Sequence, residues 1–307
     1  MSETSANENL VIIGSGPAGL TAGIYASRAG LKPLIIEGML SGGQLTKTNE
    51  VENYPGFENP QTGLSIMASM RSQAEKAGVR FEMDEISEVD FSSPIKRLTG
   101  MMGDVTANAV IIATGAGARW TNLPGEEKYK NKGVSACAVC DGAFFKGADV
   151  AVIGGGDTAL GEALYLSRIA KTVYLIHRRD NFRGAKVLAE RVFNTPNIKV
   201  LWNTTVQSFE GDGTRLTSLK LSKEREIAVS GAFVAIGHEP ETKFLKGAVA
   251  LDDSGYIKVE RTRTNIEGVF AAGDCADPFY KQAVIAAGAG AQAAIEAQHY
   301  LQERGLV

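Results

Sequence analysis

A pair of closely spaced cysteines is the first feature of this chain that could do chemistry. Cys137 and Cys140 enclose Ala-Val, and Asp141 follows directly. Two thiols at this spacing at a helix start can form a small-ring disulfide, and the helix lowers the pKa of one of them. We therefore favour a redox-active disulfide over a zinc site or two inert thiols. Zinc needs about four ligands, and only Cys275 and three scattered histidines remain.

Asp141 is the candidate proton donor for this pair. A disulfide reduced by a hydride equivalent also needs a proton, which a carboxyl group can supply when burial raises its pKa. The alternative is that Asp141 only caps the helix. Cys275 follows Asp274 at the end of an apolar run, where its expected role is packing.

A glycine-rich turn near the start of the chain predicts a dinucleotide site. Gly14, Gly16 and Gly19 follow an apolar run and open a helical pattern. These glycines permit a tight bend, a close approach of backbone to pyrophosphate, and packing of helix on strand. The helix N-terminus then faces the phosphates. Glu37 follows at the position where an acid accepts a hydrogen bond from a ribose hydroxyl. The alternative is a glycine-rich turn that binds no ligand.

A second glycine-rich turn, at 154–159, has the same context but a different set of partners for the ribose. At the position that corresponds to Glu37 of the first site, the chain has His177 instead of an acid. Arg178, Arg179 and Arg183 follow it. Guanidinium groups bind a dianionic 2′-phosphate better than a neutral hydroxyl. The second site is therefore predicted to prefer NADPH over NADH, and a solvated basic loop is the alternative.

Two repeated β-α-β units are expected to position these turns. Each has buried apolar runs of the kind that form parallel strands, and the repeat extends over whole domains. The runs are 10–13, 34–36 and 110–115 in the first unit, and 150–153, 172–176 and 233–237 in the second.

The predicted fold class is α/β, with two Rossmann-like nucleotide-binding domains of the three-layer ββα type. The apolar run at 268–274 has no counterpart in the second unit and is expected to return to the first. The second domain is therefore inserted into the first. The expected bounds are 1–116 with 246–307 for the first domain and 119–243 for the inserted one, with hinges at Ala116–Arg119 and Thr242–Gly247.

Composition argues against several other classes of protein. The net charge is −3 without a basic block, which disfavours nucleic-acid binding. No apolar stretch is long enough for a membrane span. The polar N-terminus is expected to be a disordered tail rather than a signal peptide. Three cysteines in 307 residues suit a reducing cytoplasm better than a disulfide framework.

Taken together, the motifs resemble those of the low-molecular-weight thioredoxin reductases of bacteria, lower eukaryotes and plants. The resemblance covers the chain from Leu10 to about Arg304. It is carried by Gly-Ser-Gly-Pro-Ala-Gly (14–19), Gly-Gly-Gln-Leu (42–45), Val-Glu-Asn-Tyr-Pro-Gly (51–56), Ala-Thr-Gly (113–115), Cys-Ala-Val-Cys-Asp-Gly (137–142), Gly-Gly-Gly-Asp-Thr-Ala (154–159), His-Arg-Arg-Asp-Asn-Phe-Arg (177–183), Ala-Gly-Asp (272–274) and Lys-Gln-Ala (281–283).

The resemblance implies a homodimeric thioredoxin-disulfide reductase with FAD in the first site and NADPH in the second. Electrons would pass from NADPH through FAD to the Cys137–Cys140 disulfide and on to thioredoxin. Cys140 would be the thiol nearest the flavin, and Cys137 the one that attacks thioredoxin. Asp157 departs from the pattern, because many relatives have Asn at this position.

The resemblance also implies two sets of cofactor-binding residues and no metal. The FAD set is Gly14, Ser15, Gly16, Pro17, Ala18, Glu37, Gly42, Gly43, Gln44, Asn53, Ala113, Thr114, Gly115, Gly273, Asp274, Lys281, Gln282 and Ala283. The NADPH set is Gly154, Gly156, Asp157, Thr158, His177, Arg178, Arg179 and Arg183.

Nicotinamide and disulfide share the inserted domain in this interpretation, yet both must reach one flavin. We therefore expect the inserted domain to rotate about the two hinges between half-reactions. A same-fold reductase or oxidase acting on another dithiol partner is the alternative function. A non-catalytic flavin-binding regulator is disfavoured, because it would have lost the cysteines or the arginines.

Overall fold

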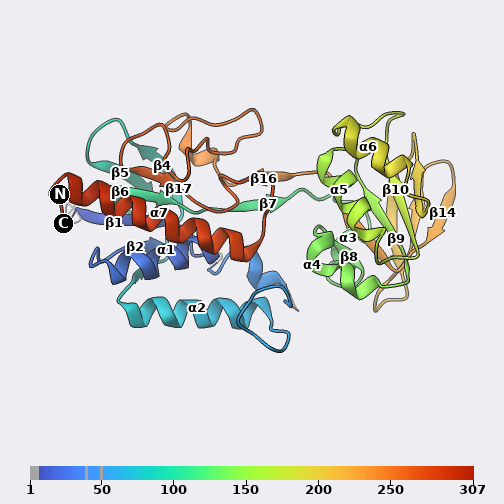
Figure 1. Ribbon diagram of the computed structural model, residues 1–307, viewed down its shortest axis with the longest axis horizontal. Coiled ribbons are helices and arrows are strands. Elements are labelled where there is room, and N and C mark those ends of the chain that lie inside the picture. Colours follow the sequence, from blue (N-terminus) through green and yellow to red (C-terminus); the bar gives the residue numbers. More distant parts are fainter. Residues whose placement is uncertain (1–6, 39–40, 49–50) are drawn as a thin grey trace. The chain divides into compact units, whose positions relative to one another are not determined.

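The computed structural model describes residues 7–38, 41–48 and 51–307, so most of the expected N-terminal tail lies outside the described residues. The chain forms two compact units. The first unit contains the residues up to Gly117 together with Glu239–Val307, and the inserted unit is Ala118–His238 (Figure 1). The fold is α/β, as predicted.

The first unit has a mixed sheet at its centre. Its strand order is β3-β2-β1-β6-β5-β4, and β17 also pairs with β6. The first three strands, β6 and β17 are parallel, whereas β4 and β5 add an antiparallel hairpin. The bounds are β1 Glu8–Ile13, β2 Leu34–Ile36, β3 Arg80–Glu82, β4 Ile86–Asp90, β5 Lys96–Gly100, β6 Asp104–Ile112 and β17 Val269–Ala271.

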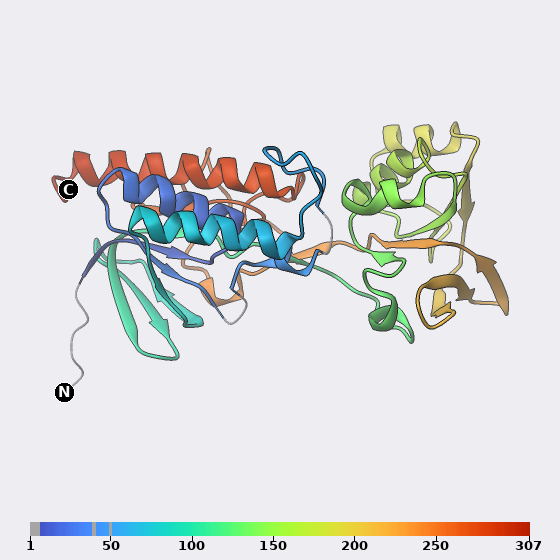
Figure 2. The same ribbon diagram turned by 90° about the horizontal axis from the view of Figure 1, so that it is seen from below.

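Three helices cover one face of this sheet: α1 (Pro17–Arg28), α2 (Gly63–Ala77) and α7 (Ala283–Glu303) (Figure 2). Pro17 is at the start of α1, where its missing N–H costs nothing. Thr62 caps α2 by accepting from Ser65 N at 3.0 Å, and Gly78 ends it in the left-handed conformation.

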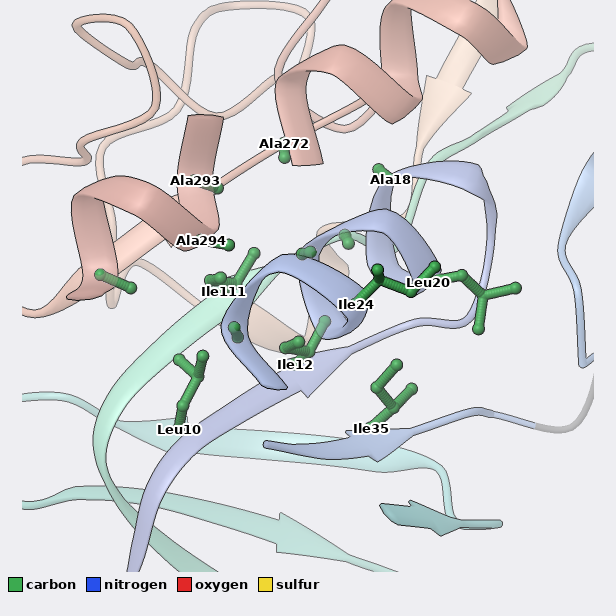
Figure 3. Close-up of a cluster of buried hydrophobic side chains, with 14 of the residues drawn as sticks. Leu10, Ile12, Ala18, Leu20, Ile24, Ile35, Ile111, Ala272, Ala293 and Ala294 are labelled. Atoms are coloured by element: carbon green, nitrogen blue, oxygen red, sulfur yellow. The ribbon is translucent and has the colours of Figure 1, made fainter. Parts of the chain in front are cut away.

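The core of the first unit lies between the sheet and these helices. Alternate residues of β1 point to opposite faces, so Leu10 and Ile12 face the helices while Val11 and Ile13 pack on the other side. Both faces are therefore apolar, as expected for parallel strands. The helix-side cluster drawn in Figure 3 includes Leu10, Ile12, Leu20, Ile24, Ile35, Ile111, Ala293 and Ala294.

The inserted unit repeats the nucleotide-binding pattern. Its parallel sheet has the order β11-β10-β9-β15-β8, and a separate antiparallel sheet has the order β12-β13-β14. The bounds are β8 Val134–Ser135, β9 Asp149–Ile153, β10 Thr172–Ile176, β11 Ile198–Leu201, β12 Val206–Gly211, β13 Leu216–Leu221, β14 Arg225–Ala228, β15 Gly231–Val234, α3 Glu126–Tyr129, α4 Ala138–Asp141, α5 Asp157–Leu166 and α6 Lys186–Phe193.

The two segments that join the units run as paired strands, β7 (Ala116–Ala118) and β16 (His238–Pro240). The first predicted hinge contains β7. The second, Thr242–Gly247, lies within the first unit, which the chain re-enters at Glu239. Backbone bonding explains the difference, because Glu241 N donates to Gly115 O at 3.0 Å and so ties the residues before the predicted hinge to the first unit.

Within the described ranges, every helix is too short or too polar to cross a lipid bilayer.

Candidate active site

The first glycine turn has the geometry that a pyrophosphate site needs. Gly14 has φ +106°, and a Cβ there would lie 2.4 Å from Ala113 O. A Cβ on Gly19 would lie 1.9 Å from Gly14 O, so both glycines are required by the protein itself. Gly16 differs, because a Cβ there would meet no atom within 4 Å. That open space at the start of α1 is large enough for the close approach that a pyrophosphate would need.

Hydrogen bonds bring distant predicted flavin residues to this turn. Gly42 N donates to Ser15 Oγ at 3.0 Å, and a Cβ on Gly43 would lie 3.2 Å from Gly16 Cα. The loop at 42–44 therefore closes over the turn. Likewise, Asn53 Nδ2 donates to Gln282 Oε1 at 3.2 Å, which joins two predicted segments far apart in the sequence. The other predicted residues of this set, Pro17, Ala18, Gln44, Thr114, Gly115 and Ala283, belong to the same unit.

Glu37, the predicted ribose acceptor, has a cationic neighbour that the sequence analysis missed. Arg71 Nη1 lies 2.5 Å from Glu37 Oε2, and Ser41 Oγ donates to the same oxygen. The guanidinium group is also 4.2 Å from the centre of the Phe81 ring. Arg71 therefore orients the carboxylate and compensates its charge. It lies on α2, and a solvent-facing helix arginine gives no sequence signal of this role.

Asp274, which follows β17, and Lys281 are a second pair of oppositely charged side chains that influence each other. Burial raises the pKa of Asp274 to about 6, against the smaller lowering effect of Lys281. Burial also lowers the pKa of Lys281. Gly273, with φ +78°, lets the strand approach α1, since a Cβ would be 3.0 Å from that of Ala18. A partly buried carboxyl that directly follows Gly273 suits a hydrogen bond to a hydroxyl-bearing cofactor.

The second glycine turn repeats this geometry in the inserted unit. Gly154 has φ +157°, and a Cβ there would lie 2.3 Å from Ala235 O. Gly156 begins α5 with an extended backbone, and a Cβ there would meet nothing within 4 Å. Asp157 Oδ1 accepts from Ala185 N at 2.7 Å, so this carboxylate is used to hold the loop that follows the arginines.

His177 packs against the loop at residues 178–183, which carries Arg178, Arg179 and Arg183 and is called the arginine loop below. It is 6% exposed, and its Nε2 is 2.9 Å from Asn181 O. Its ring lies between Gly155, where a Cβ would be 2.2 Å from Nδ1, and the side chains of Phe182 and Trp202. Burial lowers its pKa. These contacts give His177 a supporting role in the structure, and its predicted contact with NADPH stays a prediction.

The predicted phosphate-binding groups are accessible. Arg178, Arg179, Arg183 and Thr158 are all exposed. Arg183 N donates to Gly155 O at 2.8 Å, which joins the arginine loop to the glycine turn. Three guanidinium groups thus lie on a loop fixed to the turn that would receive the pyrophosphate.

Cys137 and Cys140 form a disulfide at the start of α4. Cys137 caps the helix, and its Sγ accepts from Cys140 N at 3.2 Å. Cys140 is exposed and Cys137 is half-buried. Burial raises the pKa of Asp141, with a smaller lowering effect from its hydrogen bond with Ser135. The condition for Asp141 to act as a proton donor, a carboxyl with a raised pKa, is therefore met.

Glu162 is a second carboxyl at this pair that the sequence analysis missed. Ala138 N donates to Glu162 Oε1 at 3.2 Å. Burial raises the pKa of Glu162 to about 7, against the smaller lowering effect of that N–H. On α5 it resembles any helix glutamate, and only the packing of α4 on α5 reveals the contact.

Cys275 is fully buried in the apolar cluster behind the sheet of the first unit, as expected for a packing role. Among the residues that the structure describes, no group of three or more His, Cys, Asp or Glu side chains could hold a metal ion.

A chain with two such glycine turns, and a disulfide in the same unit as one of them, matches a known family over most of its length. Residues 8–292 match the family model described as pyridine nucleotide-disulphide oxidoreductase. The chain belongs to this family. The disulfide of this family member lies in its inserted unit, and its remaining cysteine, Cys275, is buried in the first unit.

Relatives of this family member include enzymes named thioredoxin reductase. One from Streptomyces coelicolor is 48% identical, over 95% of this chain and 94% of that protein. A "bifunctional thioredoxin reductase/thioredoxin" from Mycobacterium leprae is 46% identical, over 97% of this chain and 68% of that protein. The solved thioredoxin reductase from Giardia duodenalis is 41% identical with a TM-score of 0.93, covering 97% of this chain and 100% of that one. The resemblance found in the sequence is confirmed.

Proposed function

We propose that this chain is an NADPH-dependent flavoprotein that reduces the disulfide of thioredoxin. One observation carries the proposal most directly. The Cys137–Cys140 disulfide lies in the same unit as the glycine turn and arginine loop of a dinucleotide site, while a second such turn lies in the other unit. A chain with two dinucleotide sites and a disulfide is equipped for electron transfer from one nucleotide, through another, to sulfur.

The two open glycine positions support the assignment of two cofactors. Gly16 and Gly156 each leave room at a helix start that a Cβ would fill. In the first unit, FAD would be held at Gly14–Ala18, Glu37, the 42–44 loop and Asp274. In the inserted unit, NADPH would be held at Gly156 and by Arg178, Arg179 and Arg183. When bound, these cofactors supply a hydride and pass its electron pair towards the disulfide.

The remaining steps fall to the protein's own residues. Reduction breaks the bond between the two sulfurs, and Asp141 is proposed to donate a proton to the sulfur that leaves. The reduced pair then attacks the disulfide of thioredoxin through Cys137, forming a mixed disulfide. Cys140 resolves it, which restores the Cys137–Cys140 bond and releases reduced thioredoxin.

Thioredoxin is proposed as the partner because relatives over nearly the full chain carry the name thioredoxin reductase. The Mycobacterium leprae relative combines reductase and thioredoxin in one name. By similarity to the family we also propose a homodimer in the cytoplasm. A rotation of the inserted unit about the β7 and β16 segments remains a proposal, motivated by the need for one flavin to serve both nicotinamide and disulfide.

An anaerobic half-reaction tests the proposal. The purified protein is mixed with NADPH or with NADH, while the flavin absorbance and the number of free thiols are followed. We expect rapid bleaching by NADPH and two new thiols, which the Cys140→Ser variant does not form. Turnover with oxidised thioredoxin, but not with oxidised glutaredoxin or a small disulfide, then identifies the partner. No bleaching by either nucleotide would refute the electron path.

A further inference from the structure

The Cys137–Cys140 turn is held by a carboxyl from a neighbouring helix. Glu162, on α5, accepts a hydrogen bond from Ala138 N at 3.2 Å through Oε1. Ala138 is the residue directly after Cys137 and is fully buried. The contact therefore fixes the backbone between the two cysteines, which is the part of the chain that must keep its geometry when the sulfurs separate.

The second oxygen of the Glu162 carboxyl group is buried and lacks the hydrogen bonds that water would supply. Glu162 Oε2 has no hydrogen-bond partner among the residues that the structure describes. An ionised carboxylate in that position loses hydration without a cation to replace it, so its charge is sensitive to any other charge nearby. Such an arrangement is costly for a residue whose only role is structural, because a glutamine would make the same bond to Ala138 N without the charge.

The charged and titratable groups around Glu162 lie on α5 itself and on the elements packed against it. The elements packed on α5 are α4, α6, β9 and β10. Their groups, with those of α5 itself and the ends of α4, are Cys137, Cys140, Asp141, Asp149, Asp157, Tyr165, Tyr174, Lys186, Glu190 and Arg191. Of these, the two cysteines and Asp141, the proposed proton donor, are the groups whose charge changes in the redox cycle, and labelling or substituting glutamate alone separates Glu162 from Asp141.

We propose that Glu162 is a positioning residue for the redox pair, whose carboxylate anchors the backbone of the Cys137–Cys140 turn and whose charge sets how readily the reduced pair forms a thiolate. The proposal rests on the proposed function only in taking these two cysteines as the working pair. It assigns the control of thiol reactivity to a side chain outside the Cys-Ala-Val-Cys-Asp motif.

The direction of the effect follows from electrostatics. A carboxylate close to a thiol disfavours the thiolate and raises the thiol pKa, whereas a neutral carboxyl does not. Burial raises the pKa of Glu162 to about 7, and a cysteine thiol ordinarily titrates at about 8.5, so we expect the two titrations to be coupled. The thiols of the wild-type protein should therefore titrate over a broader range than a single group does.

Peptide-resolved alkylation of the chemically reduced protein tests this inference. The protein is reduced with a phosphine and exposed briefly to iodoacetamide between pH 5 and 10. Mass spectrometry then gives the rates at Cys137 and Cys140 separately. In Glu162→Gln, which keeps the acceptor for Ala138 N, we expect a single sharp transition. Its midpoint should be lower by about one pH unit, which is about tenfold more thiolate below both midpoints.

A matched variant controls for the loss of a negative charge as such. Glu190 is exposed on α6 of the same unit, and Glu190→Gln should leave the wild-type profile unchanged. Identical profiles for Glu162→Gln and wild type would overturn the proposal, as would an equal shift in both variants.

A measurement on the wild-type protein keeps the test open if Glu162→Gln does not fold. With ¹³C-labelled glutamate, the infrared difference spectrum between the oxidised and reduced protein near pH 7 should show a change in carboxyl protonation. Its absence would contradict the coupling. Neither measurement uses NADPH or thioredoxin, so a failure of the proposed function would appear separately, as absent turnover beside an intact alkylation shift.

Discussion

Two adjacent glycines of the second turn should respond to the same substitution in opposite ways. Gly156 has an extended backbone that any residue can adopt, and a Cβ there meets nothing within 4 Å. A Cβ on Gly155 would lie 2.2 Å from His177 Nδ1. That ring cannot retreat easily, because it is buried against Phe182 and Trp202.

The magnitudes follow from these contacts. Gly156→Ala should leave the free energy of unfolding unchanged or raise it by about 0.4–1 kcal/mol, because alanine restricts the unfolded chain. The methyl group would occupy the space proposed for the nucleotide phosphates, at an overpacking cost of about 1–3 kcal/mol. That cost corresponds to a Kd for NADPH raised by roughly 5- to 150-fold. Gly155→Ala should instead lower the free energy of unfolding by about 1–3 kcal/mol.

Urea denaturation and anaerobic NADPH titration separate the two outcomes. Flavin content should stay at the wild-type level in Gly156→Ala, since that residue belongs to the inserted unit. If Gly156→Ala binds NADPH as tightly as wild type, the phosphates do not approach this glycine and the reasoning from open space fails. If Gly155→Ala is as stable as wild type, the packing assigned to His177 is wrong.

Three further outcomes can be checked. Replacing both Arg178 and Arg179 by Ala should raise the KM for NADPH at least tenfold, from about 1.5–3 kcal/mol per lost charged hydrogen bond, and leave the KM for NADH nearly unchanged; equal losses for both nucleotides would contradict the 2′-phosphate assignment. Asp141→Asn should slow thiol formation by roughly 10²- to 10⁴-fold in stopped-flow experiments while flavin bleaching by NADPH stays normal, and slower bleaching would point to a wider defect. Because burial raises the pKa of Glu162 from 4.5 to about 7, the folded state binds more protons between these values. The wild-type free energy of unfolding should then fall relative to Glu162→Gln as pH rises through this window, by up to about 3 kcal/mol, whereas a constant difference in urea titrations would exclude the shift.

Short local patterns were sufficient to predict the turns and the strands that lead into them. Gly14 and Gly154 are required by contacts with strands that end beside them, and glycine is the residue that the sequence must show there. The repeat of apolar runs likewise predicted β1, β2, β9 and β10 within two residues of their bounds.

Groups brought in by tertiary packing could not be predicted in this way. Arg71 and Glu162 each lie on a helix whose pattern predicts only a solvated charge, and their partners are distant in the sequence. The compact inserted unit ends at His238, whereas the sequence-based expectation was residue 243. The short strand β16, His-Glu-Pro, has no apolar alternation that would mark it as a strand, so the next loop was taken as the hinge.

The pairing of β7 with β16 gives the inserted unit adjacent ends. Arg119 N donates to Gly237 O at 2.9 Å, so this unit of more than one hundred residues starts and finishes one hydrogen bond apart. For the first unit the whole insertion is then topologically equivalent to a tight turn, and its length adds little to the entropy of closing the fold. The thiol pair, the glycine turn and the arginine loop are thus carried on a module that a short turn could replace, leaving the first unit's sheet and helices continuous.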